Sequence, residues 1–100
     1  MMITVLAAGL IAVPAAARLE SSAADGFVST NEALLPLPAD KAWAAVTSWS
    51  QWWDPAHSYS GTPGAIVLDP QAGGGLVERW PGGSITHASV LTVMPPALLR

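Results

Sequence analysis

Glu78 and His87 are the residues of this chain whose types and spacing could support acid–base chemistry. They flank Pro81-Gly82-Gly83, a break between two apolar stretches that is typical of a tight hairpin. If Gly82 and Gly83 form the turn, Glu78 and His87 face each other across the two strands. A carboxylate and an imidazole in contact can act as base and acid, and burial shifts the pKa of both. We therefore treat Glu78 and His87 as candidate catalytic residues, with an ordinary cross-strand ion pair as the alternative.

The same register divides the hairpin into two faces. One face is expected to combine large apolar side chains with the Glu78–His87 pair, and the other is mixed. The first comprises Leu76, Glu78, Trp80, Ile85, His87 and Leu91, and the second Val77, Arg79, Thr86, Ala88 and Val90.

A metal site is a second interpretation of these residues. His57, the other histidine, could join Glu78 and His87 to give two imidazoles and one carboxylate, a set that binds divalent metals. The spacing matches no helix-borne ligand motif, and the chain has no cysteine. We therefore predict no metal and no cofactor.

The stretch WWDPAHSYSG, residues 52–61, concentrates aromatic side chains near a proline. Trp52, Trp53, His57 and Tyr59 could line the mouth of a pocket, where flat rings with polar groups suit an apolar ligand. Trp80 is expected to complete this ligand-binding set. The alternative is that the tryptophans, together with Trp43 and Trp49, are ordinary core.

Three consecutive glycines, Gly73-Gly74-Gly75, resemble a phosphate-binding loop only superficially. An apolar strand pattern follows them instead of a helix, and no Lys-Ser or Lys-Thr completes the motif. We expect these glycines to permit a turn or a close backbone approach.

Charge excludes some partners. The net charge is −3, and the four basic residues are scattered along the chain. No basic stripe is available to neutralise nucleic-acid phosphates or an anionic membrane surface, so we expect neither partner.

The first 17 residues form an apolar run that ends in Pro14-Ala15-Ala16-Ala17. This run is short for a bilayer span, and its small residues resemble a cleavage site, so residues 1–17 are predicted to be a signal peptide. Cleavage near Ala17 would make the protein periplasmic or secreted. Residues 18–25, RLESSAAD, are expected to form a flexible lead-in.

The remaining pattern alternates between strand and helix signals. A first strand is expected over 27–35, and Pro36 and Pro38 then precede a helix over 42–49. A very short helix should follow around Trp52, capped by Ser48 or Ser50 and ended before Pro55. Strands are expected over 65–69, 75–80 and 84–93.

Three segments carry a resemblance to a known family: LPLPADKAWAAVTSWSQWWDPAHSYSG, GGGLVERWPGGSITHASV and VMPPALLR. In type and order, residues 26–100 resemble the N-terminal part of a START-like helix-grip (SRPBCC, polyketide-cyclase-like) domain, near the branch of activators of a heat-shock chaperone ATPase. The resemblance implies an α+β fold in which an antiparallel sheet, with two short N-terminal helices, encloses an apolar cavity. The family's long C-terminal helix is missing from this pattern, so we expect a partial domain whose uncovered sheet favours self-association.

This resemblance implies that the chain binds a small hydrophobic molecule. One alternative is a cyclase- or hydrolase-type enzyme that uses Glu78 and His87 in the same cavity. Another is a protein that interacts with a chaperone ATPase, which the predicted export argues against.

Overall fold

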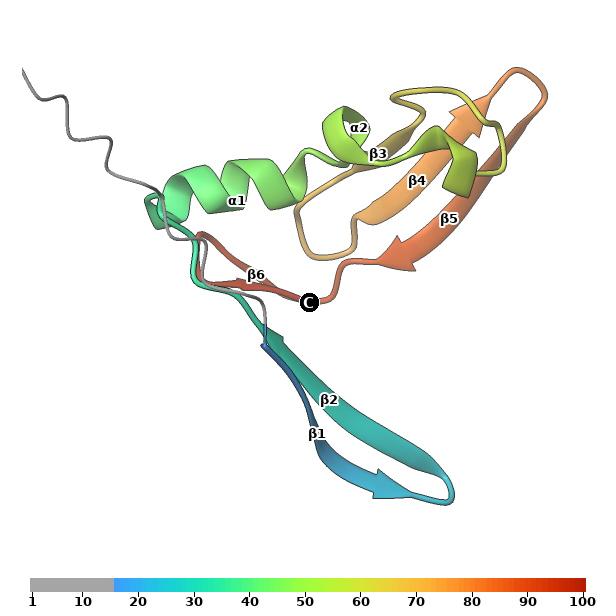
Figure 1. Cartoon of the computed structure of the whole chain (residues 1–100). Helices are drawn as coiled ribbons and strands as arrows, with labels where there is room; N and C mark the ends of the chain where they lie inside the picture. The colour runs from blue at the N-terminus through green and yellow to red at the C-terminus, as the bar shows by residue number, and fades with distance from the viewer. Residues whose placement is uncertain (1–15) are drawn as a thin grey trace, which may run out of the picture. The chain divides into compact units, whose positions relative to one another are not determined.

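The computed structural model describes residues 16–100, and its chain divides into two compact units, Met1–Pro36 and Leu37–Arg100 (Figure 1). The fold is α+β, with antiparallel sheets and two short α-helices, as the sequence predicted. The boundary follows Pro36, whereas the sequence analysis placed residues 26–100 in one partial domain. The predicted signal peptide lies almost wholly outside the described residues.

The described part of the first unit is a β-hairpin. Strand β1 (Ala16–Ala23) pairs antiparallel with β2 (Gly26–Glu32), with an irregularity between Leu19 and Ser21. Residues 18–25, expected to be a flexible lead-in, instead form most of β1 and the turn that follows it. Their small and polar composition resembles that of a loop, but it also suits a hairpin exposed on both faces, because the backbone hydrogen bonds come from β2.

The second unit begins with the expected helices. Helix α1 (Ala39–Thr47) starts directly after Pro38, whose fixed φ and missing N–H are compatible with a helix start. Helix α2 (Trp49–Trp52) follows at once, and the 3₁₀ turn η1 (Pro55–His57) comes after it. Ser48 is the N-cap of α2, as predicted, although its side chain makes no capping hydrogen bond.

A three-stranded antiparallel sheet follows in the order β3-β4-β5. Its strands are β3 (Ile66–Leu68), β4 (Gly75–Trp80) and β5 (Gly83–Ser89), and α2 packs against β3. The last predicted strand was too long, because β5 ends at Ser89 and the chain then forms a separate small hairpin. That hairpin consists of β6 (Val93–Met94) and β7 (Leu98–Leu99).

The predicted register of the β4–β5 hairpin is wrong by two residues next to the turn and by one residue beyond the bulge. The turn consists of Pro81 and Gly82, so Trp80 pairs with Gly83 and Glu78 pairs with Ile85. Gly82 has a φ of 93°, and proline followed by glycine at positive φ is the residue pair of a type II turn. A turn at Gly82 and Gly83, as expected from the sequence, would shift the pairs of residues 77–80 by two residues and those of Gly75 and Leu76 by one.

The glycine-rich segment before β4 makes a close backbone approach, as predicted. A Cβ atom at Gly74 would meet the carbonyl oxygen of Asp69, and Gly73 has a φ of 84°. Gly73 donates its N–H to the Val90 carbonyl at 2.9 Å, and Val90 donates to the Gly74 carbonyl at 2.9 Å. The three glycines therefore connect the start of β4 to the chain that follows β5.

The buried interior is small. Among the described residues, the buried apolar side chains are Ile66, Leu76 and Val90, and the buried charged side chain is Glu78. Leu91, which was expected on the same face as Glu78, lies beyond β5 and is 65% exposed. None of the helices within residues 16–100 combines the length and apolar character needed to span a membrane.

Candidate functional site

Glu78 is the centre of the candidate site. It lies in β4 between Ile66 of β3 and Ile85 of β5, and its side chain is 0% exposed. Its carboxylate oxygens accept hydrogen bonds from the backbone N–H groups of Tyr59 at 3.2 Å and Ser60 at 2.7 Å. A carboxylate in a predominantly apolar sheet requires such donors, because an unpaired buried charge is strongly unfavourable.

The segment between η1 and β3 is shaped to present these two N–H groups. Asp54 accepts a hydrogen bond from the Ala56 N–H at 2.9 Å and so caps η1. The Ser58 hydroxyl donates to the Pro55 carbonyl at 2.8 Å and accepts from the Gly61 N–H at 3.1 Å. Local side-chain-to-backbone bonds of this kind fix turns. We call residues 58–61 the anchored loop.

These contacts determine the charge of Glu78. Burial by itself raises the pKa of this carboxyl, but hydrogen bonds from Ser60, His87 and Tyr59 outweigh it and lower the pKa from 4.5 to about 2. Glu78 is therefore a carboxylate at neutral pH.

His87 is the third partner of Glu78. Its Nε2 atom lies 2.9 Å from Oε2 of Glu78, so the expected contact is present. The two residues are nevertheless not paired across the strands: Val77 pairs with Thr86 and Leu76 with Ala88, which leaves His87 as the extra residue of a β-bulge. Bulges redirect side chains, and here the imidazole is directed to Glu78 despite the shifted register.

The Tyr59 ring completes a small open surface. Its centroid is 5.9 Å from that of His87, with the planes inclined by 47°. Tyr59 is 73% exposed and the His87 side chain 24% exposed. A fixed backbone thus carries an aromatic ring that is open to solvent beside a partly exposed imidazole.

The predicted ligand-binding tryptophans in and beside α2 form a separate cluster. The rings of Trp49, Trp52 and Trp53 lie with their centroids 4.7 to 6.0 Å apart. The Trp52 indole donates to the Ala45 carbonyl at 2.8 Å, although the residue remains 49% exposed. Indole hydrogen bonds thus connect Trp52 to α1 and Trp53 to the His57 carbonyl of η1.

The His57 backbone carbonyl accepts a hydrogen bond from the Trp53 indole at 3.3 Å, but the His57 and Trp80 side chains make other contacts. The His57 Nε2 atom is 4.0 Å from Asp54, and both side chains are largely exposed. The Trp80 indole covers Gly83, where an added Cβ would lie 2.7 Å from the ring. Within residues 16–100 there is no group of three or more metal-ligating side chains, so His57 does not join Glu78 and His87.

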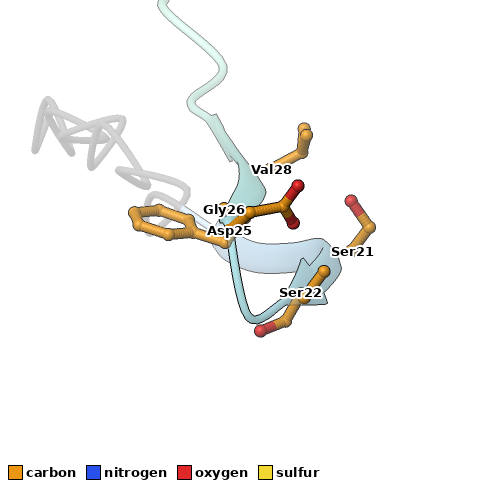
Figure 2. Close-up of a pocket in the computed structure, with 7 residues that line it drawn as sticks. Ser21, Ser22, Asp25, Gly26 and Val28 are labelled. Atoms are coloured by element: carbon orange, nitrogen blue, oxygen red, sulfur yellow. The ribbon is translucent and has the colours of Figure 1, made fainter.

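A hollow at the tip of the β1–β2 hairpin contains none of the predicted site residues. Its volume is about 360 Å³, and Figure 2 shows its lining side chains around the turn. Small and polar residues dominate this lining: Ser21, Ser22, Ala23, Asp25, Gly26, Phe27 and Val28. An open hollow at the end of an exposed two-stranded hairpin lacks the enclosing apolar walls of a ligand pocket.

Sequence reasoning identified Glu78, His87 and Tyr59 but missed Ser60 and the backbone donors of the anchored loop. Tyr59 was selected for its ring, whereas its N–H makes the contact with Glu78. A signal was present in the serines at 58 and 60, which are typical of a hydrogen-bonded turn.

Comparison of the chain with protein-family models, with curated proteins and with solved structures found no match.

Proposed function

We propose that residues 37–100 are part of a START-like helix-grip domain that binds a small hydrophobic molecule. The main contact is the surface formed by Tyr59 and His87, which the anchored loop and Glu78 hold in position. Trp52, Trp53, His57 and Trp80 remain the further ligand-binding residues of this proposal. Export of the mature protein and self-association through the sheet belong to the same proposal.

The observation that carries the proposal is the exposed ring of Tyr59 on a backbone that is hydrogen-bonded to Glu78. An aromatic side chain usually buries its ring, yet Tyr59 is 73% exposed while its N–H is fixed on Glu78. Because the loop is already ordered, a ligand that stacks on this ring loses little loop entropy on binding.

The order of elements also supports the proposal. Two short helices precede an antiparallel sheet, and apolar side chains remain exposed near the sheet. Val67 of β3 is 51% exposed, Leu91 is 65% exposed, and Met94 of β6 is 58% exposed. Such surface is available to cover a ligand or a second chain.

The enzyme alternative has weaker support. A general base works best when its pKa is near the operating pH, and a pKa of about 2 makes Glu78 a poor proton acceptor. A carboxylate that is 0% exposed and already accepts three hydrogen bonds is also inaccessible to a substrate. These features suit a positioning role. No observation favours the chaperone-interaction alternative.

The proposal is tested by titrating the full ¹⁵N-labelled chain with 2-methoxynaphthalene, an apolar ring without a hydrogen-bond donor. We expect saturable amide shifts at Tyr59, Ser60 and His87. The Tyr59→Ala variant should bind about threefold to tenfold more weakly, since an aromatic contact contributes about 0.5–1.5 kcal/mol.

Phe27→Ala is the matched control, because Phe27 is an equally exposed ring, at 72%, in the β1–β2 hairpin. This variant should bind as the unmodified chain does. Equal weakening by both substitutions, or shifts spread over every exposed apolar residue, would indicate non-specific adsorption and refute the proposal.

A further inference from the structure

We propose that Glu78 fixes His87 with its proton on Nε2 and thereby presents Nδ1 as a hydrogen-bond acceptor, so that the site selects apolar ligands that carry a hydroxyl group. This inference rests on the proposed function and specifies its ligand. It makes His87 the residue that determines specificity and Glu78 a positioning residue.

The first step is the assignment of the proton between the two side chains. Glu78 Oε2 lies 2.9 Å from His87 Nε2, and the carboxyl group also accepts the N–H groups of Tyr59 and Ser60. A carboxyl that receives several donors is held as a carboxylate, which can only accept hydrogen bonds. Nε2 must therefore be the donor in the contact with His87.

The second step concerns the other ring nitrogen. A neutral imidazole with its proton on Nε2 has an unprotonated Nδ1, which can only accept. Within residues 16–100, the one hydrogen bond of the His87 ring is that to Glu78. Nδ1 therefore has no hydrogen-bond partner among the described residues, and the side chain that carries it is 24% exposed.

The third step is the position of this acceptor. The β-bulge at His87 turns the imidazole toward Glu78, and the exposed Tyr59 ring lies 5.9 Å away. A flat apolar molecule resting on Tyr59 would place its edge near the imidazole. A hydroxyl at that edge can donate to Nδ1, whereas an ether oxygen at the same place cannot.

The test compares 2-naphthol with 2-methoxynaphthalene, which differ in the hydroxyl proton and one methyl group. The full chain, titrated at mildly alkaline pH, should bind 2-naphthol about threefold to tenfold more tightly, as expected for one neutral hydrogen bond. In the His87→Lys variant this preference should disappear. Lysine can still donate to Glu78 but has no acceptor, so the contact that positions residue 87 is retained.

A second measurement does not depend on the variant. The ring ¹⁵N shifts of His87 in the unmodified protein should show a protonated Nε2 and an unprotonated Nδ1, with Nδ1 responding to 2-naphthol and not to 2-methoxynaphthalene. Equal affinity for the two probes, or a neutral ring protonated on Nδ1, would overturn the inference while leaving the proposed function intact. If neither probe binds, the proposed function fails and the inference fails with it.

Discussion

At the scale of single residues, the molecule is organised around a carboxylate that the solvent cannot reach. Glu78 is the buried charged side chain of the described residues, and its oxygens are shared between the anchored loop and the imidazole of His87. A buried carboxylate stabilises the fold only when hydrogen-bond donors surround it, because the same charge without donors would oppose folding. Glu78 therefore couples the loop that carries Tyr59 to the sheet.

This coupling predicts a specific pH dependence. Because the pKa of Glu78 is lowered from 4.5 in the unfolded chain to about 2 in the fold, its stabilisation is complete above about pH 4.5 and is lost as the pH falls through about 2. Glu78→Gln should lower the urea midpoint at pH 7, since its amide group cannot replace a carboxylate facing three donors. The difference in urea midpoint between the unmodified protein and Glu78→Gln should decrease to near zero as the pH falls from about 4.5 to about 2.

The stability of the unmodified protein must be compared with that of Glu78→Gln, because Glu20 also makes the fold less stable at low pH. Hydrogen bonds from Arg18 and Thr30 lower the pKa of Glu20, which lies on the exposed hairpin. Both proteins retain Glu20, so its effect cancels in the difference. A gap that remains constant from pH 7 to pH 2 would show that Glu78 is not held as a carboxylate.

At the scale of elements, the close approach at Gly74 limits what the β3–β4 connection can accommodate. We expect Gly74→Ala to lower the free energy of unfolding by about 1–3 kcal/mol, because its Cβ would meet the backbone of Asp69, which cannot rotate away. The measurement is urea unfolding followed by tryptophan fluorescence.

Gly75→Ala is the matched control for this substitution. There the added Cβ would lie 3.2 Å from a Val77 methyl group, which belongs to a side chain that can adjust. We expect Gly75→Ala to lower the free energy of unfolding clearly less than Gly74→Ala does. The reverse order would mean that the approach of residue 74 to Asp69 is not tight.

Most elements, but not their pairing, could be predicted from the sequence. Pro38 and Pro55 mark a helix start and a helix end, and glycines separate the strands, so the pattern was sufficient for α1, α2 and β4. Register depends on which two residues form the turn, and Pro81-Gly82 and Gly82-Gly83 are both acceptable turn sequences. The contact between Glu78 and His87 was anticipated from the wrong register, and it exists because a bulge compensates for the shift.

At the scale of the whole molecule, the two units differ in how they are stabilised. The buried apolar side chains Ile66, Leu76 and Val90 all belong to Leu37–Arg100. In residues 16–36 the hairpin exposes Leu19 at 62% and Phe27 at 72%. The strand expected over 27–35 is confirmed in large part by β2, whereas β1 was not predicted, because residues 18–25 are small and polar and show no apolar alternation.

The candidate site was predictable only where side chains carry the chemistry. Aromatic and titratable residues are visible in a sequence, which is why Tyr59, His87 and Glu78 were selected. The backbone donors that hold Glu78 come from a turn 18 and 19 residues earlier in the chain. No local pattern predicts such a long-range contact, since it depends on how the loop folds back onto β4.

The central claim, that the surface of Tyr59 and His87 binds an apolar ligand, is tested most directly by intermolecular nuclear Overhauser effects. The measurement uses the full chain saturated with 2-methoxynaphthalene. We predict contacts from the probe to the ring protons of Tyr59 and His87. Contacts confined to Leu19 and Phe27 of the β1–β2 hairpin, or no contacts at all, would contradict the claim.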